Sequence, residues 1–104
     1  MIKHLVLLQF KSSLEVSEIN DICKQFKALI KVIPSIKQFS YGKNCSPEKL
    51  NKGITHAFVI EFDDIPGRDA YLNHPEHIRL AQEIIIPALE NGLDSALVVD
   101  YESH

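Results

Sequence analysis

The fold is decided by the stretch Ile54-Thr55-His56-Ala57-Phe58-Val59-Ile60-Glu61-Phe62. Its side chains alternate with a period of two, which is the repeat of a β-strand. One face carries Ile54, His56, Phe58, Ile60 and Phe62, and the other carries Thr55, Ala57, Val59 and Glu61. Because large apolar residues stand on both faces, the stretch predicts a strand that is covered on both sides.

Three other stretches also predict strands. Residues 2–10 and 95–101 are apolar in both phases of the alternation, whereas residues 36–43 form a weaker strand that ends near Gly42. Residues 44–53 are polar and form a loop that closes at Gly53. We therefore expect a four-stranded sheet with its interior strands buried on both faces.

The first predicted helix follows residues 2–10. Ser17 can cap its start, and the helix is expected to run to about Ile33, where Pro34 stops it. Apolar residues recur within it at the helical spacing of three or four, and lysines face outward. The residues of the apolar stripe are Ile19, Ile22, Cys23, Phe26, Ile30 and Ile33.

Two more helices follow the strand at residues 54–62. A short one covers residues 66–72, with Pro66 in its first turn. The last runs from Pro75 to about residues 91–92, where Gly92 suits a C-terminal stop, and Pro87 is expected to kink it.

The resulting order, β-α-β-β-α-β, predicts the ferredoxin-like arrangement of the α+β class. Its helices pack on one face of the sheet, yet the strands carry apolar side chains on the other face too. These are Leu5, Leu7, Ala57 and Val59. Because this chain has nothing left to cover them, we expect a homodimer in which two sheets face each other, a dimeric α/β barrel.

Length and composition narrow the class of protein. The 104 residues suit one domain, residues 1–104. A net charge of −3 argues against a nucleic-acid partner, which needs a basic surface. The apolar N-terminal run is too short to span a membrane and lacks signal-peptide anatomy, so no membrane partner is expected. Cys23 and Cys45 fit no metal or redox spacing, and we expect reduced thiols in a cytoplasmic protein.

Several motifs resemble the stress-responsive dimeric A/B-barrel (Dabb) family. They are His4-Leu5-Val6 with Phe10, Ile33-Pro34-Ser35-Ile36, Tyr41-Gly42-Lys43-Asn44, Gly53-Ile54-Thr55-His56-Ala57-Phe58 and Tyr71-Leu72-Asn73-His74-Pro75-Glu76-His77. The resemblance covers nearly the whole chain. It implies the sheet-to-sheet homodimer that the apolar strand faces predict, and a stress-response barrel with a pocket between sheet and helices. That pocket is expected to take a small apolar or aromatic ligand.

One kind of family member closes polyketide rings by a cofactor-free aldol reaction, and this chain is similar to it in register from His4 through His77. The similarity implies that His77 is a general base and that Tyr71 holds the substrate carbonyl. Histidine titrates near neutrality, and a phenol can donate to a developing enolate oxygen. Side chains expected to line this pocket are His4, His56, Phe26, Phe58 and Ile60. Both Tyr71 and His77 can also be structural, Tyr71 as a core aromatic with its hydroxyl at the rim.

His4 and His56 occupy the same phase of their strands, each two positions after an isoleucine. We expect them to lie close together on the helix-facing side of the sheet. They can line the pocket, or they can form a hydrogen-bonded pair that fixes the packing of the core. The sequence leaves both interpretations open.

Metal binding has two candidate sites. His74 and His77 share one helical face at a spacing of three, but no cysteine or carboxylate partner stands near them, and His74 beside Pro75 is more simply a helix-start residue. The family resemblance implies a second site, a divalent cation such as Mg²⁺ held by the backbone carbonyls of Ile30, Ile33 and Ile36. No cofactor is required by the proposed chemistry.

The sequence therefore leaves three alternative hypotheses for the function. The first is a non-catalytic barrel that binds a small ligand, and the second is a cofactor-free cyclase or lyase with His77 and Tyr71 at its centre. The third, from the wider fold group, is a cofactor-independent monooxygenase acting on quinol-like aromatics. The third ranks last because the chain has no Trp and none of that group's characteristic motifs.

Overall fold

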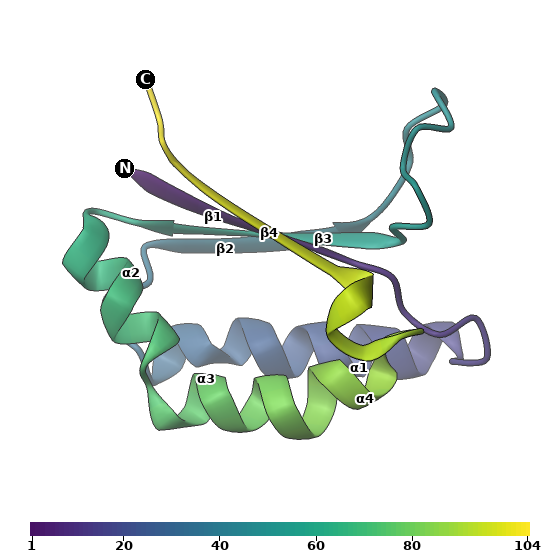
Figure 1. The fold of residues 1–104 in the computed structure, drawn as a ribbon. Helices are drawn as coiled ribbons and strands as arrows, with labels where there is room; N and C mark the ends of the chain where they lie inside the picture. The colour runs from purple at the N-terminus through teal and green to yellow at the C-terminus, as the bar shows by residue number, and fades with distance from the viewer.

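A computed structural model describes all of residues 1–104 (Figure 1). The expected order of strands and helices is confirmed. The strands are β1 (Ile2–Leu8), β2 (Gln38–Lys43), β3 (His56–Phe62) and β4 (Ala96–Glu102). The α-helices are α1 (Val16–Lys27), α2 (Ile65–Leu72), α3 (Pro75–Leu80) and α4 (Ile86–Ala88). Short connecting turns are the 3-10 helices η1 (Ala28–Lys31) and η3 (Gly92–Ser95) and the π-helical segment η2 (Ala81–Ile85).

The sheet has the strand order β2-β3-β1-β4, and every neighbouring pair is antiparallel. This is the ferredoxin-like order that the sequence predicts. Figure 1 shows all helices on one side of the sheet, while the 44–55 loop and the two chain termini project from the other side. A membrane-spanning segment is not found among these helices, since none combines the length with the apolar composition that it would need.

The first helix begins and ends differently from the prediction. It starts at Val16 rather than after Ser17, because the backbone N–H of Glu15 donates a hydrogen bond to the Glu18 carboxylate at 3.0 Å. Glu15 is thus the N-cap, with Glu18 at the third helical position. The α-helix ends at Lys27 and tightens into η1, so only a 3-10 turn approaches Pro34.

The last helix is shorter than predicted. It ends at Ala88, because Leu89 turns to extended backbone and forms an isolated antiparallel bridge with Phe10. Gly92 therefore does not stop this helix; with φ of 57° it begins η3. The irregularity expected at Pro87 lies just before it, in η2, where the N–H of Ile86 reaches back to the carbonyl of Ala81. Pro87 has no N–H to continue the α-helical ladder.

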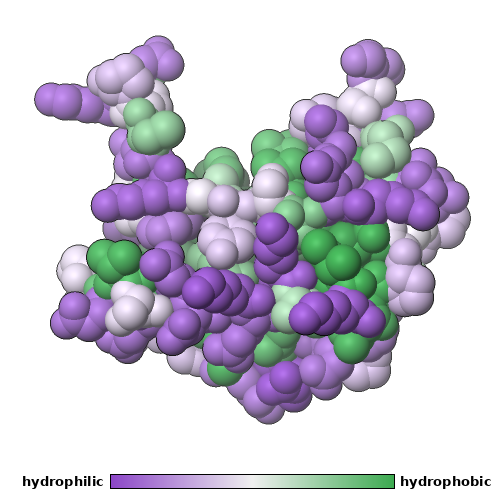
Figure 2. Space-filling view, turned by 180° about the vertical axis from the view of Figure 1, so that it is seen from behind, coloured by the Kyte–Doolittle hydropathy of each residue, from purple (hydrophilic) through white to green (hydrophobic).

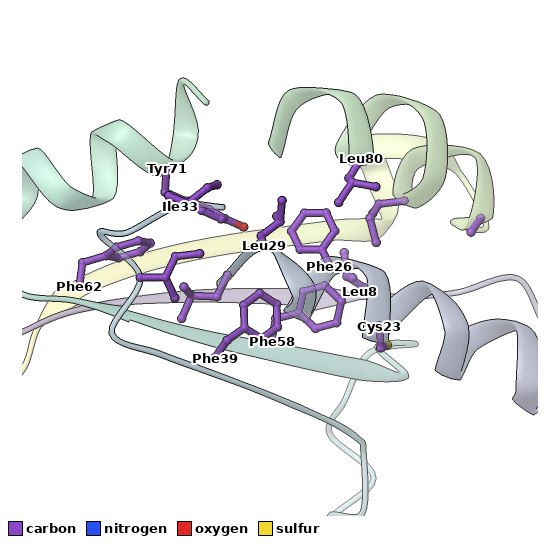
Figure 3. Close-up of a cluster of buried hydrophobic side chains, with 14 of the residues drawn as sticks. Leu8, Cys23, Phe26, Leu29, Ile33, Phe39, Phe58, Phe62, Tyr71 and Leu80 are labelled. Carbon is purple, nitrogen blue, oxygen red and sulfur yellow. The ribbon is translucent and has the colours of Figure 1, made fainter. Parts of the chain in front are cut away.

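The core fills the space between the sheet and the helices (Figure 3). Aromatic rings dominate it: Phe58 of β3 lies 5.5 Å from both Phe26 of α1 and Phe39 of β2, measured between ring centroids. Cys23 also lies here, and burial raises the pKa of its thiol to about 11, so it behaves as a small apolar side chain.

The opposite face of the sheet carries exposed apolar side chains. On β4, Leu97, Val99 and Tyr101 are each about half exposed. From behind, Figure 2 shows apolar atoms at the floor of the hollow between the two projecting segments. This face has no cover within the chain, in agreement with the pattern of the sequence.

Candidate functional site

A cavity of about 410 Å³ lies between the sheet and the helical segments α2, α3, η2 and α4. Most of its lining is apolar, but four polar residues also line it: His4, Tyr71, His77 and Asp100. Its apolar lining residues are Val6, Leu8, Phe26, Phe58, Leu72, Ala81, Ile85, Ile86, Leu89, Leu93, Ala96 and Val98. A cavity of this size with a few polar groups in an apolar wall is typical of a small-molecule site.

Tyr71 reaches from α2 into this region and is fully buried (Figure 3). Its hydroxyl is buried without any hydrogen-bond partner. The expectation that the Tyr71 hydroxyl lies at the rim of the core is therefore wrong. Burial raises the pKa of Tyr71, so the phenol stays neutral and keeps its proton as a donor. A buried donor without an acceptor costs about 1–3 kcal/mol.

His77 projects from α3, and its imidazole lies against the ring of Tyr71 with the centroids 4.3 Å apart. The Nδ1 of His77 lies 3.2 Å from the carbonyl oxygen of Leu72. Because a carbonyl can only accept, Nδ1 carries the proton, and the neutral ring has its lone pair on Nε2. Burial lowers the pKa of His77; the bond to Leu72 opposes this, and the nearby His4 and His74 add to the lowering. The imidazole is therefore a neutral base at pH 7.

His4 is held by a residue that the sequence analysis missed. Its Nδ1 lies 2.6 Å from Oδ1 of Asp100, its partner in the β1–β4 register. The other oxygen of Asp100 accepts from Nη1 of Arg68 at 3.0 Å, and Arg68 also pairs with Asp69. The ring of His4 meets Tyr71 edge-on, with the centroids 5.8 Å apart. The isolated carboxylate in the apolar strand at residues 95–101 was the signal that could have found this network.

His56 does not lie beside His4, so that expectation is wrong. The two residues share the helix-facing side, but β1 and β3 are antiparallel, with His4 opposite Ile60 and Leu8 opposite His56. That register separates them by four residues, or roughly 13 Å at about 3.3 Å per residue. His56 consequently lies in a different cavity. Both hypotheses that required the two histidines together, a hydrogen-bonded pair and a shared pocket, fail for the same reason.

The other expected pocket residues divide in two. Phe26 and Phe58 line the cavity, and the Phe26 ring lies 5.8 Å from that of His77. Ile60 is completely buried in the core and is not part of the cavity wall. His74 caps α3 by accepting the N–H of Glu76 at 3.1 Å, which confirms its role as a helix-start residue.

Few groups in the structure could bind Mg²⁺. No group of three or more His, Cys, Asp or Glu side chains could hold a metal ion. Of the backbone carbonyls expected at Ile30, Ile33 and Ile36, that of Ile33 already accepts the N–H of Ile36 at 3.2 Å. Mg²⁺ is normally bound through carboxylates in octahedral geometry. The carbonyl site therefore stays a prediction.

Sheet, helices and cavity together define a ferredoxin-like α+β protein with a ligand-sized apolar chamber on its helical side. Within that class, the chain belongs to the stress responsive A/B barrel domain (Dabb) family, whose model matches residues 2–103.

Two relatives are similar to this chain over most of its length. The chain is 32% identical to the stress-response A/B barrel domain-containing protein HS1 of Arabidopsis thaliana, over 97% of this chain and 88% of that protein. It is 27% identical to olivetolic acid cyclase of Cannabis sativa, over 74% of this chain and 76% of the cyclase.

Solved structures agree with the fold. The Arabidopsis thaliana protein At3g17210 superimposes with a TM-score of 0.91 at 31% identity, covering 100% of this chain and 96% of that one. A dimeric ferredoxin-like protein of unknown function from Jannaschia sp. CCS1 gives 0.86 at 28% identity, with 98% of each chain covered. The hydroxynitrile lyase of Passiflora edulis also gives 0.86, at 25% identity, with 99% and 93% covered.

Proposed function

We propose that this chain is a homodimeric barrel that binds a small apolar or aromatic molecule carrying one carbonyl oxygen, in the cavity around Tyr71 and His77. The observation that carries the proposal is the buried Tyr71 hydroxyl without an acceptor. A ligand carbonyl placed there would accept its hydrogen bond, while the rest of the ligand packs on the apolar wall.

The homodimer is supported by the open face of the sheet. Val99 and its exposed neighbours on β4 continue the apolar surface of Leu5 and Leu7 on β1. A second copy applied sheet to sheet would remove this surface from water. Related structures from Jannaschia and Bacteroides fragilis are described as dimeric ferredoxin-like proteins.

A second candidate is a cofactor-free enzyme acting on a carbonyl compound, favoured by the contact between His77 and Tyr71. In this scheme the Nε2 of His77 takes a proton from the carbon next to the carbonyl, and the Tyr71 hydroxyl donates to the enolate oxygen that forms. Olivetolic acid cyclase is among the relatives, and a hydroxynitrile lyase is among the similar structures; both names are names of enzymes. No metal is needed for either step.

Binding can be tested by thermal unfolding with two matched probes. Acetophenone has an aromatic ring and a carbonyl, whereas ethylbenzene lacks only the carbonyl oxygen. We expect acetophenone to raise the Tm of the wild type by mass action and ethylbenzene to raise it less. His77→Ala and Tyr71→Phe should weaken the acetophenone effect, and His104→Ala, in the C-terminal tail, should not. The absence of any acetophenone effect on the wild type would reject this ligand class.

Catalysis has a separate test. In D₂O, a base that removes the methyl proton of acetophenone returns a deuteron, so the methyl signal disappears in NMR spectra. We expect this exchange in the wild type and its loss in His77→Ala and Tyr71→Phe. Binding without exchange would leave the ligand-binding proposal standing and remove the enzyme.

A further inference from the structure

A second cavity, of about 590 Å³, lies where β1 and β2 end and β3 begins. It shares no lining residue with the cavity around Tyr71 and His77. Tyr41 and His56 in the wall of this cavity lie on the helix-facing side of the sheet. The partner in a sheet-to-sheet dimer would cover the opposite side. The proposed function makes no use of this cavity.

Its most informative group is the imidazole of His56. The hydroxyl of Thr55 donates to the carbonyl of Leu8 at 3.2 Å and accepts from the N–H of Phe10 at 3.2 Å. It therefore meets Nδ1 of His56, 2.9 Å away, as an acceptor. Nδ1 then carries the proton, and Nε2 keeps a lone pair with no partner in the protein. Burial, and next the charge of Lys43, lower the pKa of His56, so the ring is neutral at pH 7.

Two cations stand beside this acceptor. Lys43 is the cross-strand partner of His56, and Lys11 lies in the segment that follows β1. Neither forms an ion pair, whereas Lys3 and Lys37 do. One carboxylate, that of Glu90, also lines the cavity. The two lysines and this one carboxylate leave the lining with a net positive charge. The cavity thus attracts an anion.

The remaining wall is apolar on one side. The ring of Phe10 meets His56 edge-on with the centroids 5.1 Å apart, and Tyr41, Leu14 and Ile19 continue the surface. An inorganic anion would have no apolar part to pack on this wall. A simple fatty or aromatic acid would have no hydroxyl to donate a hydrogen bond to Nε2 of His56. A ligand that uses every feature needs an acid group, a hydroxyl and an apolar body.

We propose that this cavity is a second ligand site, specific for a small organic acid that carries a hydroxyl group. The carboxylate of the ligand pairs with Lys43 and Lys11, its hydroxyl donates to Nε2 of His56, and its apolar body packs on Phe10 and Tyr41. The site operates independently of the cavity around Tyr71 and His77.

Three probes separate these contributions. 3-Hydroxybenzoate has all three features, benzoate lacks the hydroxyl, and 3-hydroxybenzyl alcohol lacks the negative charge. Titration into the protein, followed by amide NMR shifts, should show 3-hydroxybenzoate binding saturably with the largest shifts at Gly42 and Thr55. We expect each truncated probe to bind about tenfold more weakly, since each loses a hydrogen bond to a charged or buried group.

Variants test the residues. Lys43→Gln should weaken 3-hydroxybenzoate about tenfold and leave 3-hydroxybenzyl alcohol unchanged. His56→Phe keeps the ring against Phe10 but removes the acceptor, so it should weaken 3-hydroxybenzoate and leave benzoate unchanged. Lys24→Gln removes an exposed lysine of α1 and should change nothing.

Several results would overturn the proposal. Equal affinity for the three probes would show that neither the charge nor the hydroxyl is recognised, and shifts that do not saturate would show that there is no site. Shifts centred on Leu72 and Ala81 would place the probe in the other cavity. Acetophenone provides a separate readout: if the second site is independent, saturation with acetophenone leaves the affinity for 3-hydroxybenzoate unchanged, and a failure of acetophenone to bind has no bearing on it.

Discussion

Nδ1 of His4 lies 2.6 Å from Oδ1 of Asp100, although the two residues are 96 positions apart in the sequence. The β1–β4 register places them opposite each other, and Arg68 of α2 holds the second carboxylate oxygen. Asp100 thus joins the first strand, the last strand and the helix that carries Tyr71. It also fixes the proton of His4 on Nδ1, because a carboxylate accepts.

Asp100→Asn should lower the free energy of unfolding by about 2 kcal/mol, because Arg68 loses the charge of a partner that is only 20% exposed. Urea denaturation measures this change. The matched control is Asp69→Asn, which removes the other partner of Arg68. Asp69 is 52% exposed, and its loss should cost at most about 0.5 kcal/mol. Equal effects of the two substitutions would contradict a structural role for the Asp100 network.

The sequence identified His4 but not Asp100, for a physical reason. Alternation shows which face of its own strand a residue occupies, but pairing between strands far apart in the chain depends on register. The same limit explains the error at His56: its face was correct, but the antiparallel register moved it to the other end of β1. Tyr71 and His77 were easier to bring together, because they are six residues apart on consecutive helices.

Tyr71→Phe should leave the protein as stable as the wild type, or more stable by about 1 kcal/mol, because it removes a buried hydroxyl that has no partner. The same substitution should weaken acetophenone binding. Urea denaturation and thermal shift measure the two effects separately. Tyr41→Phe, on β2 and outside the cavity, should change neither. A loss of more than about 1 kcal/mol in Tyr71→Phe would show that the hydroxyl has a partner in solution, such as a buried water.

Helix ends were predicted less well than strand order. The order rests on the large, repeated signal of apolar alternation, whereas the ends of α1 and of the last helix depend on single contacts. Glu18 takes the N–H of Glu15, and the bridge between Leu89 and Phe10 ends the helix before Gly92 is reached. Such contacts become visible only when the packing is known.

Val99→Lys should convert the proposed dimer into a monomer at micromolar concentration, because a buried lysine without a partner costs several kcal/mol. Sedimentation velocity measures the change. Val98→Lys is the matched control: Val98 is 55% exposed against 52% for Val99, but it points to the opposite face of the same strand. Val98→Lys should therefore remain a dimer. A monomeric wild type, or equal dissociation of both variants, would remove the sheet-to-sheet dimer.

His77 should make the folded protein less stable in mild acid. Its pKa is lowered in the folded chain, chiefly by burial, from an ordinary value of 6.5. Below pH 6.5 the unfolded chain binds this proton first, so the free energy of unfolding falls as the pH drops toward the folded pKa. Above pH 6.5 this loss is absent. Urea denaturation between pH 7 and pH 5 should therefore show a shallower dependence in His77→Gln than in the wild type, by at most about 1.4 kcal/mol per pH unit. Lys24→Gln, on α1, removes an exposed charge that forms no ion pair and does not titrate in this range, and should keep the wild-type slope. An unchanged slope in His77→Gln would mean that the imidazole is solvated and can be protonated in place.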